Sequence, residues 1–122
     1  MAKRKILALA IAAALAASPA FADGNAKKGA KVFKKCKSCH TLKAGKHKSG
    51  PSLAGIIGRK AGTVDGFKKY KGLKGADFAW DEANLDKFLT NPKKFLGKKS
   101  SMTMKLKKAG DRANVIAYLK SL

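Results

Sequence analysis

Residues 36–40 read Cys-Lys-Ser-Cys-His and contain both cysteines of the 122-residue chain. A C-x-x-C-H sequence is the attachment site for c-type haem. Two thiols at this spacing can each add to one vinyl group of the porphyrin, and the adjacent imidazole is then placed to ligate the iron. The segment therefore predicts one haem c, bound covalently through Cys36 and Cys39, with His40 as a ligand of the metal.

The same five residues could also form a thioredoxin-like redox pair or half of a zinc site, or the pattern could arise by chance. Thioredoxin-like chemistry is expected in a βαβ context, which the chain does not offer. A tetrahedral zinc site needs two more Cys or His ligands, and only His47 remains. His47 stands between two lysines and is expected to be a solvated residue. A structural disulfide closing so short a loop would add little stability.

The first residues of the chain, 1–22, are typical of a secretory signal peptide. Three basic residues precede an unbroken apolar run at 6–17, and Ala20-Phe21-Ala22 forms an A-x-A cleavage site. Twelve apolar residues fall short of the roughly 20 that a membrane-spanning helix needs. The sequence therefore predicts export to the periplasm without stable membrane insertion, and one domain over residues 23–122.

The charge of the chain is strongly positive. Lys and Arg number 28 against 7 Asp and Glu, giving a net charge of +21, of which +18 lies in residues 23–122. Such a charge suits steering toward an acidic partner, a membrane surface or nucleic acid. Export argues against nucleic acid, so acidic protein partners are favoured. The lysines are also spread along the whole chain, which fits a generally solvated surface.

Helical patterns flank a long irregular segment. A first helix is expected over residues 25–35, and residues 41–79 are rich in glycine and proline and read as loops. Asp81 is the expected N-cap of a second helix, and Pro92 opens a short third one. Asp111 is the expected N-cap of the last helix, whose apolar face includes Val115, Ile116, Leu119 and Leu122. The predicted fold class is all-α with long loops.

Over residues 24–122 the sequence resembles the class I cytochromes c of mitochondria and alphaproteobacterial periplasms. The resemblance implies the cytochrome c fold, in which the first and last helices cross near Gly29 and Tyr118 and long loops wrap around one covalent haem. The matching segments are Gly29, Phe33, the C-x-x-C-H motif, Gly50-Pro51, Gly58-Arg59-Lys60, Gly66-Phe67, Trp80, Asn91-Pro92-Lys93, Met102 and Arg112 to Leu119.

A second axial ligand is expected, because methionine opposite histidine raises the reduction potential of a haem. Met102 and Met104 both lie in the loop before the last helix. The resemblance makes Met102 the distal ligand and places Met104 where an aromatic residue is usual. It also implies that His40 donates its other ring N–H to the backbone carbonyl of Pro51, which fixes its orientation. The loop before Met102 departs from the family, since it lacks the usual proline and Lys-Met pair.

Contacts to the haem propionates are also implied by the resemblance. Two carboxylates in a dry site need hydrogen-bond partners. Arg59 and Trp80 match residues that provide them, together with Tyr70, for whose place Lys69 competes. Phe88 stands where many members of the family have a tyrosine.

The function implied is that of a soluble, monomeric electron carrier with a His/Met-ligated haem, which is not an enzyme and has no catalytic residues. The partners implied are acidic redox proteins: an oxidase, a reductase, a dehydrogenase or a photosynthetic reaction centre. They would dock where lysines ring the exposed haem edge, at Lys34, Lys35, Lys48, Lys93, Lys94 and Lys108.

Two other classes of function stay open at this point. A peroxidase-like haem enzyme or ligand sensor would require that Met102 leave the iron free, but the sequence lacks a distal His and Arg pair for peroxide cleavage. A polycationic module that binds nucleic acid or anionic surfaces would carry no haem, and haem staining would distinguish it from both haem proteins.

Overall fold

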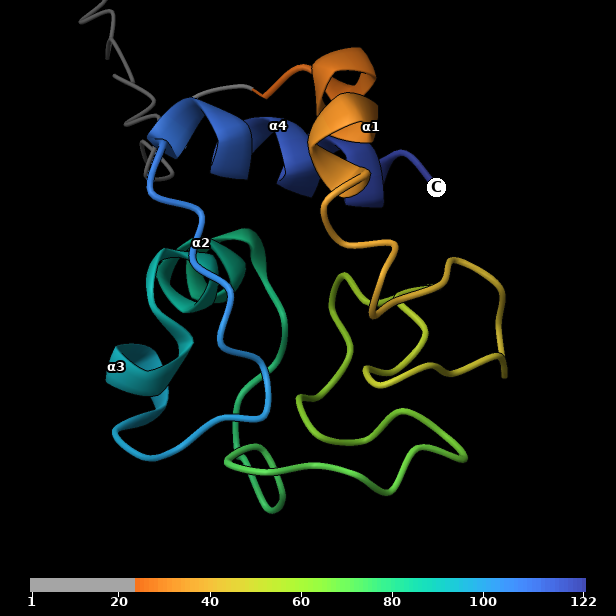
Figure 1. Cartoon of the computed structure of the whole chain (residues 1–122), viewed down its shortest axis with the longest axis vertical. Coiled ribbons are helices and arrows are strands. Elements are labelled where there is room, and N and C mark those ends of the chain that lie inside the picture. The colour runs from red at the N-terminus through yellow and green to blue at the C-terminus, as the bar shows by residue number, and fades with distance from the viewer. Residues whose placement is uncertain (1–23) are drawn as a thin grey trace, which may run out of the picture.

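The computed structural model describes residues 24–122 and confirms the all-α class (Figure 1). The predicted signal peptide, residues 1–22, lies outside this range. Within the described range there is no strand, only an isolated antiparallel bridge between Lys60 and Ala79. No helix in residues 24–122 is long and apolar enough to cross a membrane. The four helices are α1 (Ala26–Phe33), α2 (Glu82–Thr90), α3 (Pro92–Leu96) and α4 (Ala109–Lys120).

Helices α1 and α4 cross at one end of the molecule, above the other helices and the loops in Figure 1. Gly29 makes this crossing possible, because a Cβ atom there would lie 2.7 Å from the Cβ of Tyr118 and would also overlap the carbonyl of Asn114. Close to it, the Phe33 and Tyr118 rings pack with centroids 5.6 Å apart. The crossing predicted at Gly29 and Tyr118 is therefore confirmed.

Side-chain caps fix where three of the helices begin. Asn25 caps α1 by accepting the Lys28 N–H at 2.9 Å. The predicted cap of α2 is confirmed, since Asp81 accepts the Asn84 N–H at 2.7 Å. Asn91 caps α3 by accepting the Lys94 N–H at 3.1 Å, and Pro92 lies in the first turn of α3, as predicted. Each cap satisfies a backbone donor that the helix cannot pair internally, which sets the starting residue locally.

The prediction that Asp111 caps the last helix is wrong. Helix α4 begins at Ala109 with Lys108 at the N-cap position, and no side chain makes the capping hydrogen bond. Asp111 lies inside the first turn, where its negative charge still complements the partial positive charge of the helix N-terminus. Leu122 also departs from the expected apolar face, because it follows the helix end and is 63% exposed.

The long segment between α1 and α2 is held by scattered backbone hydrogen bonds. The pairing around the Lys60–Ala79 bridge is the most regular part: the Ala61 N–H donates to the Phe78 carbonyl at 2.9 Å. The Trp80 N–H donates to the Arg59 carbonyl at 2.8 Å. These bonds turn the loop back toward α2 and set Trp80 into the core, where it is 5% exposed.

His47 joins two of these loops, which corrects the expectation of a solvated residue. Its Nδ1 accepts the Ser52 N–H at 3.0 Å, so the ring proton lies on Nε2, which donates to the Asp65 carbonyl at 2.8 Å. The ring is half-buried, and it meets the edge of Phe67 at 5.6 Å between centroids.

The core lies between the helix crossing and these loops. Its buried side chains come from α1, α2, α4 and the loops between them, and an aromatic cluster links Trp80 to α2 and α3. Trp80 and Phe88 pack with centroids 4.9 Å apart, and Phe78 contacts both Trp80 and Phe95. The most buried apolar residues are Phe33, Ala61, Val115, Leu106, Ile56, Trp80, Phe88 and Ile116.

Candidate functional site

The C-x-x-C-H segment forms a turn that continues directly from the end of α1. The His40 and Cys39 N–H groups both donate to the Cys36 carbonyl, at 2.9 and 3.1 Å. This turn places both cysteines and the histidine at the wall of one cavity, with Cys36 buried and Cys39 exposed. The three residues predicted from the motif are thus brought together.

The His40 ring is fixed from behind. The Nδ1 atom of His40 lies 2.7 Å from the carbonyl oxygen of Pro51. Because a carbonyl oxygen can only accept a hydrogen bond, Nδ1 carries the ring proton, and Nε2 keeps a free lone pair. Gly50 leaves room for the ring, since a Cβ there would lie 2.8 Å from Nδ1. Burial lowers the pKa of His40, and the Pro51 hydrogen bond opposes that shift. The side chain is therefore a neutral imidazole suited to metal ligation.

The two thiols differ in their environments. Burial, and then the neighbouring Cys39, raise the pKa of Cys36. Hydrogen bonds from Ser49 and then Ser38 lower the pKa of Cys39, which is exposed. Since the thiolate is the reactive form of cysteine, the lowered pKa and the exposure of Cys39 both favour its thiolate form and its access.

The cavity has a volume of about 370 Å³. It opens between the cysteine-histidine turn, the loops of residues 49–73, helix α2, helix α4 and the segment at 100–104. Most of the residues around it are apolar. They include Phe33, Leu53, Ile56, Val64, Phe67, Leu73, Trp80, Leu85, Phe88, Leu89, Val115 and Leu119.

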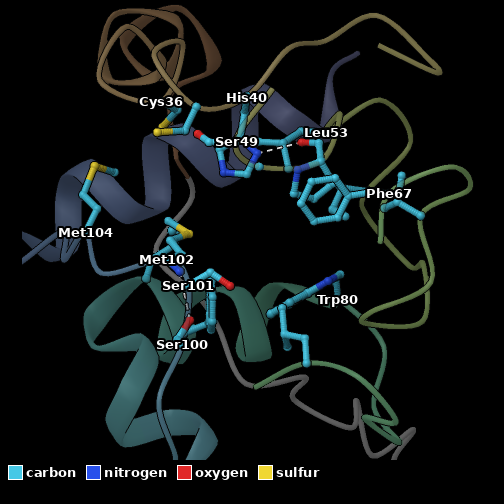
Figure 2. Close-up of a pocket in the computed structure, with 18 of the residues that line it drawn as sticks. Cys36, His40, Ser49, Leu53, Phe67, Trp80, Ser100, Ser101, Met102 and Met104 are labelled. Atoms are coloured by element: carbon cyan, nitrogen blue, oxygen red, sulfur yellow. Dashed lines mark hydrogen bonds between the residues drawn. The ribbon is translucent and has the colours of Figure 1, made fainter. Parts of the chain in front are cut away.

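Both candidate methionines line this cavity and are half-buried. In Figure 2 the Met102 side chain lies across the pocket from His40, whereas Met104 lies further to the side. A thioether at Met102 therefore faces the free nitrogen of His40 across an apolar space. Within residues 24–122, no group of three or more His, Cys, Asp or Glu side chains is placed to hold a metal ion.

The residues expected around the propionates are only partly brought together. Trp80, Tyr70 and Lys69 all line the cavity, and the Tyr70 hydroxyl accepts the Val64 N–H at 3.1 Å. Arg59 is half-buried but does not line the cavity. The carbonyl of Arg59 accepts the Trp80 N–H, so Arg59 helps to hold Trp80 in the cavity wall.

Sequence reasoning missed most of the apolar wall and the serines at its rim. Leu53, Ile56, Val64 and Leu73 lie in loops without periodicity, so no helix or strand pattern indicates that they face inward. Their only signal is apolar character within a glycine-rich segment. Ser49, Ser100 and Ser101 also line the cavity, and a serine in a loop carries no signal of its own.

Comparison with known proteins gives one consistent result. A family model described as cytochrome c matches residues 26–122. The chain is 41% identical to cytochrome c2 of Cereibacter sphaeroides over 98% of this chain and 97% of that protein. It is 48% identical to cytochrome c2 iso-2 of Magnetospirillum fulvum over 75% of this chain and 95% of that one. The structure is similar to cytochrome cH from Methylobacterium extorquens, with a TM-score of 0.73 and 35% identity over 81% of this chain and 100% of the other.

Proposed function

This chain belongs to the cytochrome c family, and we propose that it holds its haem iron between His40 and Met102 and shuttles electrons in the bacterial periplasm. It is an electron-transfer protein with one covalent haem c and not an enzyme. The observation that carries the ligand assignment is the single cavity with His40 on one wall and Met102 on the other.

The residues around this cavity fit a haem. Two free thiols and a neutral imidazole stand at one wall, and a thioether stands at the other. Trp80 lines the cavity and is 5% exposed. Its indole N–H is a donor, and a propionate carboxylate in the cavity would accept from it. The apolar walls suit the porphyrin face.

The haem, when bound, supplies an iron that alternates between the ferric and ferrous states. The chain's own residues set the conditions for that exchange. Pro51 holds the proton on Nδ1 of His40 and so keeps Nε2 aimed into the cavity. Met102 offers a soft sulfur, which favours the ferrous state. The apolar walls keep water away, which limits the reorganisation that accompanies a change of charge.

Optical spectra test the ligand assignment. The oxidised protein should show the weak near-infrared band of sulfur-to-iron ligation. Met102→Ala should abolish that band, and Met104→Ala should leave it in place because its side chain lies further from His40. A band that survives the first substitution and disappears in the second would assign the ligand to Met104 instead.

Export can be tested in the same preparation. We propose that residues 1–22 are removed, so that the mature domain begins at Asp23 and is a monomer. Mass spectrometry of protein from the periplasmic fraction should give the mass of residues 23–122 plus one haem. A chain that retains its first residues would contradict cleavage.

Acidic redox proteins are the proposed partners. Lys35 lines the cavity mouth, as do Lys69 and Lys71, so positive charge surrounds the pocket. Opposite charges accelerate encounter, and salt screens the effect because the Debye length is about 10 Å at 0.1 M. Lys34, Lys48, Lys93, Lys94 and Lys108 are exposed, and their place in the docking face remains a prediction.

Stopped-flow electron transfer to an acidic partner tests this docking face. The rate should fall as ionic strength rises, and Lys35→Glu should slow it further. Lys74→Glu is the matched control, because Lys74 is exposed but does not line the cavity. Equal slowing by the two reversals, or a rate that does not respond to salt, would show that the lysines form only a solvated surface.

A further inference from the structure

The segment that carries Met102 has few attachments to the rest of the molecule. It begins after Gly97, at the end of α3, and runs to Leu106, whose N–H donates to the Leu89 carbonyl at 2.8 Å. Between residues 98 and 105, every hydrogen bond of the described structure that reaches another segment involves Ser101. The neighbouring bond from the Met102 N–H to the Ser100 hydroxyl is local.

Ser101 makes three contacts with residues 69–71 on the opposite side of the pocket rim. Its N–H donates to the Lys71 carbonyl at 3.3 Å, and its hydroxyl oxygen accepts the Lys71 N–H at 3.1 Å. The hydroxyl hydrogen points to the Lys69 carbonyl at 3.5 Å, a long and weak contact. One serine therefore satisfies both backbone groups of Lys71, as a paired strand residue would. We call this arrangement the Ser101 clasp.

The two backbones also approach closely beside the clasp. At Gly72, with φ of +91°, a Cβ atom would lie 2.5 Å from the Lys99 carbonyl oxygen. The two segments are thus in direct contact at Lys71 and Gly72 on one side and at Lys99 and Ser101 on the other. Because both segments line the cavity, the clasp sets the distance between the Met102 segment and the wall that carries Tyr70.

The clasp also sets which methionine faces the pocket centre. From residue 101 to 106 exposure alternates: Ser101, Thr103 and Lys105 are exposed, whereas Met102, Met104 and Leu106 are half-buried or buried. An extended segment with this alternation can shift by two residues and still point a methionine inward. Ser101 is fixed to Lys71 and is the direct neighbour of Met102, so it opposes that shift.

We propose that Ser101 is a positioning residue, which holds Met102 opposite His40 by clasping Lys71. The inference rests on the proposed function, in which Met102 is the distal ligand. It gives the Met102 loop a source of rigidity in place of the proline that the sequence lacks. The hydroxyl acts through the backbone and does not itself bind the iron.

Exogenous imidazole measures how firmly Met102 is held, because it competes with the methionine for the iron. Titration of the oxidised holoprotein, followed by loss of the near-infrared band, gives an apparent dissociation constant. Ser101→Ala should lower this constant about threefold to tenfold, since the hydroxyl-mediated bonds that it removes oppose release of the methionine. Ser101→Thr keeps a hydroxyl and should restore the wild-type value.

Ser121→Ala is the control for loss of a serine hydroxyl elsewhere, because Ser121 donates to the Tyr118 carbonyl at the end of α4. It should leave imidazole binding unchanged. Equal imidazole affinity in Ser101→Ala and wild type, or failure of Ser101→Thr to restore it, would overturn the positioning role. Failure of the proposed function is seen separately, since wild-type protein would then lack the band before any substitution.

Discussion

At the crossing of α1 and α4, the two helices come into close contact at Gly29 and are held by packing, as between the Phe33 and Tyr118 rings. Around the pocket, segments without regular structure are joined by a few hydrogen bonds at isolated residues, as at His47 and Ser101. The helix crossing is stabilised by contacts between its own side chains. The loops around the pocket are stabilised mainly by whatever fills the cavity that they enclose. One small chain therefore combines a part held by direct packing with a part built around a cofactor.

Removing the cofactor should have the largest effect. A Cys36→Ala/Cys39→Ala double variant cannot attach haem and is left with a cavity of about 370 Å³. Without haem the apolar side chains that line this cavity have nothing to pack against, and the roughly 5–15 kcal/mol that stabilises a typical domain leaves little margin for such a loss. Because residues of α2 and α4 line the cavity, we expect the helical circular dichroism signal to be largely lost. A variant that stays helical would show that the crossing stands without the loops.

Gly29→Val should break the helix crossing while leaving the pocket residues intact. The new side chain would overlap Asn114 and Tyr118, and separating the helices should reduce the free energy of unfolding by about 3 kcal/mol. Denaturant unfolding of the holoprotein measures the change. Gly110→Ala is the matched control, because a Cβ at Gly110 meets nothing within 4 Å, and it should be neutral or slightly stabilising.

His47→Ala should weaken the loops by a smaller amount. It removes the acceptor of the Ser52 N–H and the donor to Asp65, so we expect a loss of about 1–2 kcal/mol in the free energy of unfolding. Faster amide exchange at Ser52, with unchanged protection in α4, would localise the effect to the loops. Lys46→Ala removes an exposed neighbour and serves as control; an equal loss there would contradict a specific role for the ring.

The smallest effect is expected at the ion pair between Lys120 of α4 and Glu82 of α2. Both side chains are partly exposed, at 49% and 35%, and exposed pairs contribute about 0–1 kcal/mol. Lys120→Ala should therefore change the midpoint of unfolding little, and the change should shrink in high salt. A loss as large as that of Gly29→Val would mean that charge, rather than packing, holds the helical part together.

The sequence predicts features that depend on neighbouring residues better than features that depend on contacts between distant loops. The start of α2 at Asp81 and of α3 at Pro92, the all-α class and the joint placement of Cys36, Cys39 and His40 all depend on residues close in the chain. Local patterns carry such information. The cap of α4 was the local exception, because Lys108 occupies the N-cap without any side-chain hydrogen bond.

The remainder of the site depends on contacts that no local pattern records. His47 pairs with Asp65 and Ser101 pairs with Lys71, eighteen and thirty positions apart, through backbone groups that every residue has. Arg59, which the resemblance places at the propionates, is not among the residues that line the cavity, whereas Tyr70 and Lys69 both line it, and the role of Arg59 stays a prediction. The sequence indicated these residue types but not the side of the loop that each one faces.

The walls of the pocket come from opposite ends of the chain, which gives its assembly an order in time. The thiols and His40 lie near the start, and Met102 follows about sixty residues later. A chain exported from its first residue onward, as the proposed signal peptide would require, presents the thiols before the distal wall. At that stage Cys36 and Cys39 stand on a chain whose pocket has only one side. Both sulfurs are then open to haem attachment before the fold closes over them.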